Sequence, residues 1–296
     1  MAGRNMGLIM VAVCCVASVV GGMAMPAQGK FVEERLADAE ARIAALEDES
    51  RNVRAEFGRA LEQLTGRIEQ LELQLAIAET TMPTRLLLHF DEGTGSVAHD
   101  SSLYENHGTI HGTEWVEGIH GSALAFDGND DWVKITSSPS LDIRETITLE
   151  AWINPAEDNR HHPIWEYNDG GPSSFPFGIH VWQYQRWSDI NINLFGRDGT
   201  HHILGAPGIL TTGWQHLAVV YDGATGRIYR NGELAAEGDL GSFQLQTSHD
   251  LYVGHRPSGG GHYFNGVIDE VAIYDTALSP GEIEAHYAAQ KAVYME

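Results

Sequence analysis

Acidic and amide side chains crowd one short turn of this sequence. Asp127, Asn129, Asp130 and Asp131 fall close together, and Asp269 follows on a later apolar run. Hard cations such as Ca²⁺ are held by several oxygen ligands, which carboxylates, amides and loop carbonyls supply. We therefore take Asp127, Asp131 and Asp269 as weak metal-ligand candidates, with Ca²⁺ as the candidate cofactor. Asp and Asn are also common in turns that bind no metal, so a plain turn stays open as the alternative.

A second group of residues carries rings suited to stacking on sugars. Segments 167–175 and 182–187 hold several aromatic residues and would form a wall, with 257–263 as its rim. Rings with a polar edge bury a large area and still form hydrogen bonds. The alternative is that alternating aromatic residues fill the core, as we expect for Trp132 and Trp152. From this group we select Trp187, His262 and Tyr263 as ligand-binding candidates.

The elements that must position these groups are short strands. From residue 85 onward apolar and polar residues alternate in brief runs separated by Gly, Asn and Asp, which predicts strands. Asn231-Gly232 predicts a tight hairpin because both residues tolerate positive φ. Ser279, Pro280 and Glu282 form a capping box, which predicts one helix after the strands. The predicted strands are 85–90, 108–111, 123–126, 131–135, 147–154, 164–167, 177–184, 189–195, 201–204, 215–221, 227–230, 251–254 and 267–274. Short, evenly spaced strands favour an all-β antiparallel two-sheet sandwich over residues 84–290.

Residues 31–81 have the pattern of one long helix with a coiled-coil seam. Apolar residues recur at alternating spacings of three and four from Val32 to Phe57, with Ser50 in one seam position. A four-residue slip, called a stutter, precedes the point where the seam resumes at Leu61. Pro83 ends the helix. Because such a helix alone would expose its seam to water, we predict a homo-oligomer, a dimer or trimer, with parallel helices. A monomeric helix folded back on the domain is the alternative.

The first 29 residues are typical of an export signal. Arg4 is the only charge before Lys30, an apolar run follows, and Ala27-Gln28-Gly29 offers small residues for cleavage. The uncharged stretch is also long enough for a retained membrane anchor. Cleavage would remove Cys14 and Cys15, the only cysteines, and leave no disulfide. We therefore predict a secreted, cell-surface or periplasmic protein, or one anchored to a membrane by its N-terminal segment.

The charge of the chain argues against nucleic acid as a partner. The formal net charge is −23, from 18 Lys and Arg against 41 Asp and Glu. Phosphate contacts need clustered basic side chains, and the sequence has no such cluster.

The second part of the chain resembles the laminin-G-like, concanavalin-A-like jelly-roll family, which is related to the pentraxins. The likeness rests on Leu88-His89-Phe90-Asp91-Glu92-Gly93, residues 122–133, residues 148–153, residues 214–218 and residues 266–283. The resemblance implies a jelly roll that mostly binds glycans or proteins and only sometimes catalyses.

The pentraxin-like members also imply a position for a ligand-bridging calcium loop. In this sequence the loop corresponds to 166–169, so Asn168 and Asp169 become ligand-binding candidates, and Asp169 also a weak metal candidate. Its second half falls on His255 and Arg256, where the family usually supplies oxygens. That departure argues against the bridging site, and Arg256 is kept as a ligand-binding candidate.

Glucanases share the same sandwich, but hydrolysis needs two carboxylates facing one groove. Asp269 and Glu270 are adjacent on a strand and should point to opposite faces. Glu150 and Glu166 are isolated acids, which we expect at the sheet margin. We therefore predict a protein that is not an enzyme: an exported, oligomeric, lectin-like or adhesion module that binds a glycan or an extracellular surface protein. The alternatives are a structural envelope protein without a small ligand and an atypical glycan-active hydrolase.

Overall fold

The computed structural model describes the backbone of residues 26–81, 84–157, 160–170, 177–184, 186–258 and 261–294. Side chains are described within these ranges except at 26–29, 72–81, 177 and 293–294. The predicted export segment, 1–29, thus lies outside the described side chains. The chain divides into two compact units, Met1–Ala76 and Ile77–Glu296. Among the helices of the described residues, none is long and apolar enough to cross a membrane.

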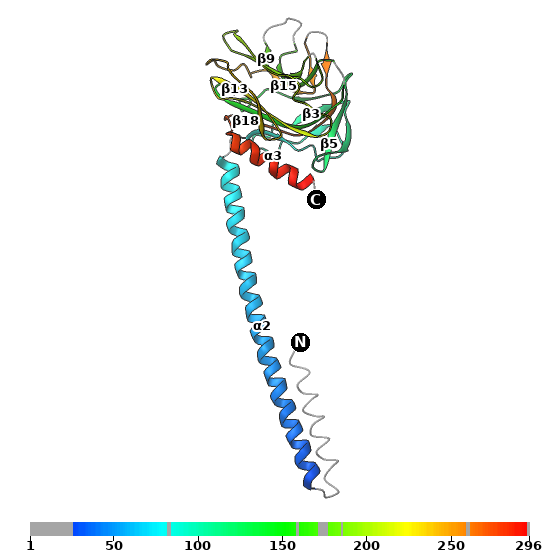
Figure 1. The fold of residues 1–296 in the computed structure, drawn as a ribbon, viewed down its shortest axis with the longest axis vertical. Coiled ribbons are helices and arrows are strands. Elements are labelled where there is room, and N and C mark those ends of the chain that lie inside the picture. Colours follow the sequence, from blue (N-terminus) through cyan, green and yellow to red (C-terminus); the bar gives the residue numbers. More distant parts are fainter. Residues whose placement is uncertain are drawn as a thin grey trace. The chain divides into compact units, whose positions relative to one another are not determined.

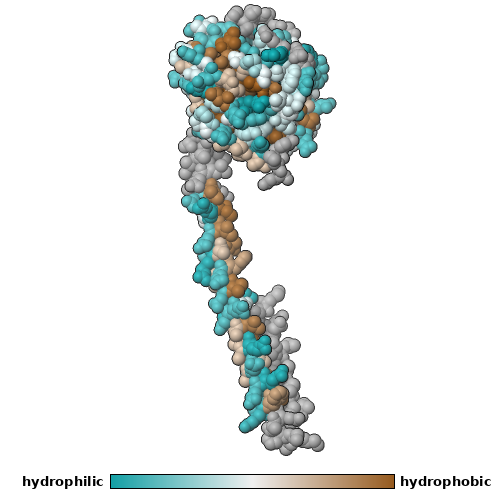
Figure 2. All heavy atoms as spheres, viewed as in Figure 1, coloured by the Kyte–Doolittle hydropathy of each residue, from teal (hydrophilic) through white to brown (hydrophobic). Residues whose placement is uncertain are grey.

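The first unit is built on helix α2, Pro26–Thr81 (Figure 1). The helix predicted for 31–81 is confirmed. It runs without a break because no proline lies between Pro26 and Pro83. Apolar side chains gather along one side of α2, with charged side chains beside them (Figure 2). Pairing of this side with a second chain stays a prediction.

The second unit is a sandwich of two eight-stranded antiparallel sheets, which confirms the predicted fold class (Figure 1). Sheet A contains, in spatial order, β14 (Glu233–Asp239), β13 (Thr225–Arg230), β12 (Gln215–Tyr221), β7 (Ile147–Pro155), β18 (Asn265–Tyr274), β5 (Ser122–Asp127) and β4 (Glu114–Glu117), with β1 (Thr84–Leu88) also paired to β18. Sheet B contains β11 (His201–Ala206), β10 (Ile190–Phe195), β9 (Phe177–Gln183), β8 (His162–Asn168), β15 (Asp250–Val253), β6 (Trp132–Ile135), β3 (Gly108–His111) and β2 (Val97–Ala98). A separate two-stranded hairpin joins β16 (His255–Arg256) to β17 (His262–Tyr263).

The main core lies between the two sheets and follows from the two-residue period of the strands. On β9, Ile179 and Val181 are fully buried in this core, so His180 and Trp182 point to the opposite face of sheet B. On β7 the same alternation buries Leu149 between the sheets. Each sheet therefore has a second face that other residues must cover or use.

Helix α3, Pro280–Tyr294, covers the second face of sheet A. The predicted capping box is confirmed: the Ser279 backbone N–H donates to Glu282 Oε2 at 2.7 Å, and the Glu282 N–H donates to Ser279 Oγ at 3.3 Å. Ile283 then packs with Ala218 and Val220 in a smaller apolar cluster. The hairpin predicted at Asn231-Gly232 is also present, with φ values of 52° and 80°.

Two tryptophans and one acid differ from their expected places in this unit. Trp132 is not in the main core: Val133 takes the inner face of β6, and Trp132 is half-buried on the other face, stacked on His111 at 4.9 Å. Trp152 is buried, but under α3 rather than between the sheets, and its Nε1 donates to Gln290. Glu150 lies on the central strand β7, not at a sheet margin.

Candidate ligand-binding face

The face of sheet B that points away from the core, here called the open face, carries one row of chemically active side chains. Lys134 on β6 pairs in register with Tyr252 on β15, and Tyr252 pairs with Glu166 on β8. Glu166 pairs in turn with His180 on β9, and His180 with Asn193 on β10. Directly paired residues on neighbouring strands place their side chains on the same side. The row therefore crosses five strands of the open face.

The Glu166 carboxyl contacts His180 Nδ1 at the centre of this row, and the two form an ion pair when His180 is protonated. Glu166 is fully buried and His180 is 3% exposed. Burial raises the pKa of the Glu166 carboxyl, and the neighbouring His180 and Arg256 act against that rise. Glu166 is thus not at the sheet margin, where we expected it, because β8 lies between β9 and β15.

Beside this pair lies a group of four half-buried rings and one arginine, here called the Trp182 cluster: His161, Trp182, Tyr184, His262 and Arg256. The Trp182 ring centroid is 4.8 Å from Tyr184 and 5.2 Å from His161. The Arg256 guanidinium lies 5.3 Å from the same Trp182 centroid. His262 completes the cluster, with its ring 5.6 Å from His161. All five side chains are partly exposed, so a ligand can reach them.

The β16–β17 hairpin places Arg256 and His262 in the cluster. His255 stacks on Tyr263 with centroids 4.4 Å apart, and His162 Nδ1 lies 2.7 Å from the Tyr263 carbonyl oxygen. Burial lowers the pKa of His255 to about 4. Burial, followed by the charge of Arg256, also lowers the pKa of His262. Near neutral pH the hairpin is therefore held by neutral imidazoles.

A second aromatic group lies on the β6 and β15 side of the open face. Trp132 stacks on His111 and lies 6.3 Å from Tyr252, edge to face. The Lys134 ammonium lies 5.7 Å from the Tyr252 centroid and forms a 2.7 Å ion pair with Asp250. On this side the open face thus combines rings with the Lys134–Asp250 ion pair.

The structure brings four of the six sequence-based ligand candidates to the same hairpin. Arg256 and His262 belong to the Trp182 cluster, and Tyr263 stacks behind it on His255. Asn168 is buried and donates from Nδ2 to Ser258 Oγ at 2.9 Å. The remaining parts of predicted segments 167–175 and 257–263 include residues outside the described part of the chain.

The other two candidates lie elsewhere. Asp169 is exposed just after the end of β8. Trp187 is half-buried and packs against the main core, and its carbonyl oxygen accepts a hydrogen bond from Gln183 Nε2.

The sequence analysis placed Trp182 and Tyr184 in the predicted aromatic wall, 182–187, but missed that Glu166 and His180 belong to the same face. A signal for His180 existed: on β9, His180 and Trp182 alternate with Ile179 and Val181, which is the pattern of a strand with one chemically active face. Only the strand order, however, places Glu166 beside that stripe.

Two of the four metal candidates come together with a third acid. Ligand atoms of Asp127, Asp130 and Asp131 lie within 4.8 Å of one another. Asn129 donates to Asp127 and lowers the pKa of its carboxyl, whereas burial and the charges of Asp127 and Asp130 raise the pKa of Asp131. Three crowded carboxylates suit a hard cation. They line one wall of a cavity of about 350 Å³ that also includes Gly112 and Glu114.

Neither Asp169 nor Asp269 joins this group of acids. Asp269 is fully buried, and its Oδ2 accepts from the Ile119 N–H at 2.9 Å and the His120 N–H at 3.3 Å. Burial and the neighbouring Glu270 raise the pKa of Asp269 to about 8. Glu270 contacts a different element, with its Oε2 2.9 Å from His89 Nδ1. The contacts of Asp269 thus fasten the 118–120 loop to β18.

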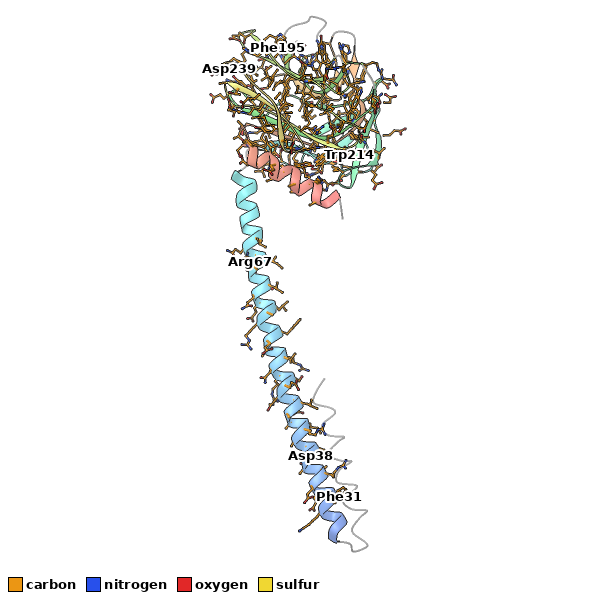
Figure 3. The ribbon with its side chains drawn as sticks, in the orientation of Figure 1. Phe31, Asp38, Arg67, Phe195, Trp214 and Asp239 are labelled. Carbon is orange, nitrogen blue, oxygen red and sulfur yellow. The ribbon has the colours of Figure 1, made fainter. Side chains whose placement is uncertain are left out.

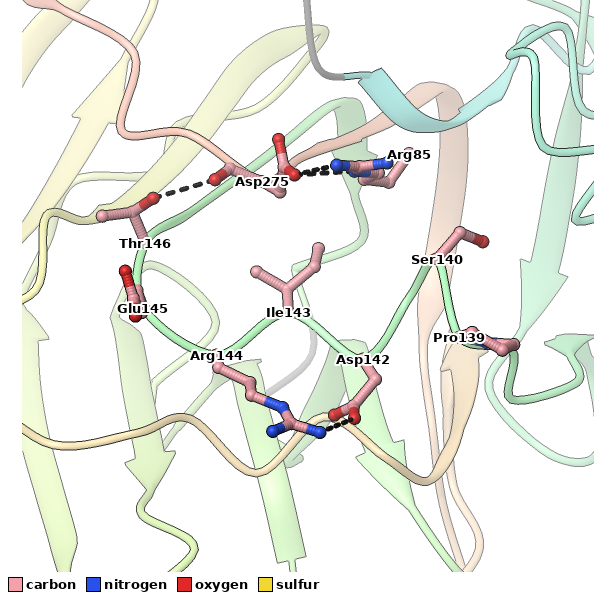
Figure 4. A pocket seen from close by; sticks show the side chains of 9 residues that line it. All are labelled: Arg85, Pro139, Ser140, Asp142, Ile143, Arg144, Glu145, Thr146 and Asp275. Carbon is pink, nitrogen blue, oxygen red and sulfur yellow. Dashed lines mark hydrogen bonds and ion pairs between the residues drawn. The ribbon is translucent and has the colours of Figure 1, made fainter.

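Another cavity of about 350 Å³ opens at the loop before β7 and is lined by charged residues (Figure 4). Arg85 pairs with Asp275 there, and Arg144 pairs with Asp142 at 2.9 Å. Thr146 also donates to the Asp275 carbonyl oxygen at 2.8 Å. Both arginines that line this cavity are paired, and it has no ring cluster like that of the open face.

Comparisons with solved structures agree with this architecture. The binding domain of Paraclostridial Mosquitocidal Protein 1 is similar at 12% identity and a TM-score of 0.55, over 70% of this chain and 52% of that one. The botulinum neurotoxin serotype D ligand binding domain, solved in complex with N-acetylneuraminic acid, is similar at 15% identity and a TM-score of 0.55, over 72% of this chain and 53% of that one. The botulinum neurotoxin serotype G binding domain matches at 14% identity with a TM-score of 0.55, over 70% of this chain and 51% of that one. The chain thus spans about half the length of these structures, and at such identities the likeness concerns the fold.

A comparison with curated proteins finds no match. The family model of the concanavalin A-like lectin/glucanases superfamily, in contrast, matches residues 127–284, which is more than half of the chain. The matched segment includes β7, β8, β9 and the β16–β17 hairpin, and therefore the strands that build the Trp182 cluster. The chain belongs to the concanavalin A-like lectin/glucanase superfamily.

Proposed function

We propose that this protein is an exported glycan-binding module whose ligand sits on the open face at the Trp182 cluster. The observation that carries the proposal is the juxtaposition of half-buried rings, the Arg256 guanidinium and the buried Glu166–His180 pair. Ligand sites typically combine aromatic walls with a few convergent polar groups.

The chemistry of the cluster suits a sugar. Tyr184 and His161 offer partly exposed rings for the C–H face of a pyranose, and each keeps a polar atom for a hydroxyl. Arg256 adds N–H donors in a fixed planar arrangement, which suit a hydroxyl pair or a carboxylate. The guanidinium is preorganised by its place beside the Trp182 ring, so less freedom is lost when a ligand binds.

The comparisons support the same class of ligand. The superfamily description includes lectins, and one structural neighbour is a neurotoxin domain solved with N-acetylneuraminic acid. A binding role is favoured over hydrolysis because the acids of the open face are already engaged, Glu166 with His180 and Asp250 with the Lys134 ammonium. We therefore propose binding without catalysis.

Calcium, export and self-association complete the proposal. A Ca²⁺ ion held by Asp127, Asp130 and Asp131 would relieve the repulsion that raises the pKa of Asp131. The apolar segment before Lys30 supports export or an N-terminal anchor. The exposed apolar side of α2 supports a homo-oligomer, and clustering of several modules would raise the avidity for a repeated glycan.

An extracellular surface protein as ligand is the second candidate. The favouring observation is the Trp132–His111 stack with Tyr252, which adds partly exposed ring surface on the other side of the open face. A protein ligand would cover both aromatic groups, whereas a short glycan needs only the Trp182 cluster.

A glycan-array screen of the full chain tests the proposal, with calcium in one arm and chelator in the other. We expect binding to a defined glycan class, and no release of reducing ends from the bound glycan. Binding to no glycan in either arm, by a folded protein, would refute the glycan proposal. Release of reducing ends would instead establish the hydrolase alternative.

A further inference from the structure

Helix α2 carries its apolar seam in the open. The large apolar seam residues between Val32 and Leu71 are 40% to 70% exposed. Outward positions carry polar side chains, of which Asp38 is seen projecting from the helix (Figure 3). Exposure of so long an apolar stripe calls for a covering partner, and the charges beside the stripe indicate which partner fits.

The seam fixes a heptad position for each charged neighbour. Leu36 and Ile43 occupy heptad position a, and Ala39 and Leu46 occupy position d. Position g then comes directly before each position a, and position e directly after each position d. The g positions then hold Arg35, Arg42 and Glu49, and the e positions hold Glu40, Glu47 and Arg54. All six side chains are exposed.

We propose that α2 self-associates as a parallel, in-register coiled coil fixed by salt bridges between these positions. The inference rests on the self-association put forward under the proposed function and adds its register and the residue pairs that set it. In a parallel pair, each g residue faces the e residue five positions later on the other helix. Arg35 then faces Glu40 of the second copy, Arg42 faces Glu47, and Glu49 faces Arg54. Every pair has opposite charges.

The change of sign along the helix disfavours a shifted register. The g residues are basic at 35 and 42 but acidic at 49, and the e residues change sign in the matching places. A slip of one heptad would bring Arg42 beside Arg54, and Glu49 beside Glu47. Like charges at these positions oppose association, so the in-register arrangement has the most favourable pairs.

The same charges disfavour an antiparallel pair along the whole helix. The antiparallel alignment that keeps the seam paired on both sides of the stutter sets Leu36 opposite Leu71. In antiparallel pairs g residues face g residues, so Arg42 would then face Arg67 of the second copy. The parallel arrangement has no such repulsion among its described side chains.

Two complementary charge reversals test the proposal in the full chain. One variant carries Arg35→Glu with Arg42→Glu, and the other carries Glu40→Arg with Glu47→Arg. When two copies of the same variant form a parallel, in-register pair, like charges face each other, so we expect self-association of each variant to weaken roughly tenfold or more. In a dimer, mixing the two variants restores opposite charges at every pair, so heterodimers should form with about the wild-type affinity; in a trimer, mixing restores them at two of the three interfaces, so mixed trimers should associate more tightly than either variant alone.

Sedimentation measures the association, and native mass spectrometry separates hetero-oligomers from homo-oligomers. The matched control, Glu34→Arg with Asp38→Arg, makes the same change of charge as Glu40→Arg with Glu47→Arg, but at outward positions, and should leave self-association intact. A wild-type monomer would refute self-association itself, and with it the basis of the inference. A wild-type oligomer that either reversal leaves unchanged, or that mixing fails to restore, would refute the parallel register alone.

Discussion

Glu166 and His180 form a buried carboxyl–imidazole pair in the middle of sheet B, on the face that points away from the core. Neither residue fills the hydrophobic interior, because Trp165 and Val181 beside them do so. A buried ion pair contributes little net stability, since desolvation offsets the attraction of its charges. Its position beside the Trp182 cluster agrees with a role in a polar ligand site.

Replacing Glu166 by Gln should destabilise the fold by about 2 kcal/mol, because a buried group loses its charged partner. Urea denaturation measures the change. Glu237→Gln is the matched control, since Glu237 is paired with Arg227 but is half exposed, and its replacement should cost less than about 1 kcal/mol. Equal effects of the two substitutions would contradict the buried pair.

His286 should make the docking of α3 depend on pH. Its Nδ1 lies 2.8 Å from Glu150 Oε2, and this hydrogen bond raises the pKa of His286 above its ordinary 6.5. The folded state therefore binds the proton more tightly than the unfolded state does. The resulting stability is fully present below pH 6.5 and is lost as the pH rises through the raised pKa.

The measurement is the free energy of unfolding of the wild type and of His286→Gln from pH 5.5 to pH 8. The gap between the two proteins should be largest at the acidic end and should shrink as the pH rises. A gap that widens with rising pH would contradict the assignment. Burial lowers the pKa of His216, so its contribution to the pH dependence of stability has the opposite sign. Both proteins contain His216, and comparing them separates its contribution from that of His286.

His255 should loosen the β16–β17 hairpin in acid. Burial lowers its pKa to about 4, so between pH 6.5 and about pH 4 the unfolded state binds a proton that the folded state does not. Stability from the neutral His255 is present above pH 6.5 and is lost as the pH falls through this window. Amide hydrogen exchange in 255–258 and 261–263 should therefore quicken at pH 5 relative to pH 7, after correction for the intrinsic exchange rate.

His255→Phe separates the proton from the stacking. The Phe ring keeps the contact with Tyr263 but cannot titrate, so the extra exchange at pH 5 should disappear. If that variant shows the same acid loosening as the wild type, another group controls the hairpin.

Calcium should stabilise the fold through the acids at 127–131. A cation at about a hundred times its dissociation constant adds about 2.7 kcal/mol, which calorimetry would detect as a higher Tm. Asp130→Asn removes an exposed member of the group and should reduce this rise, whereas Asp169→Asn should not. If only Asp169→Asn abolished the calcium-dependent rise in Tm, the ion would bind at Asp169 and not at the acids of 127–131.

Local signals in the sequence predicted the local structure well. Asn231-Gly232 and the Ser279 capping box each act over four residues or fewer, and both formed as expected. Among the missed strands, β4 contains Trp115 and Val116, which favour strands, but β2 has only two residues and β14, Glu-Leu-Ala-Ala-Glu-Gly-Asp, has few such side chains. Such segments are fixed by their neighbours in the sheet and not by their own sequence.

The candidate site could be predicted only in part, because it depends on strand order. Arg256 was identified from the pentraxin-like loop and His262 from the rim segment 257–263, each from its own stretch of sequence. Glu166 was placed at a sheet margin because nothing local shows that β9 and β15 flank β8. Its partner His180 comes fourteen residues later in the chain, beyond the reach of any short motif.

The most direct test of the account is a binding titration of four variants against the glycan that the array identifies. Arg256→Ala and Tyr184→Ala remove members of the Trp182 cluster, while Arg144→Ala and Tyr104→Ala remove an arginine and an exposed tyrosine of the same sandwich that lie outside the cluster. We predict that each of the first two weakens binding tenfold or more, roughly the effect of losing a central contact, and that the last two leave it unchanged. Wild-type affinity in Arg256→Ala and Tyr184→Ala would contradict the assignment of the ligand to the open face.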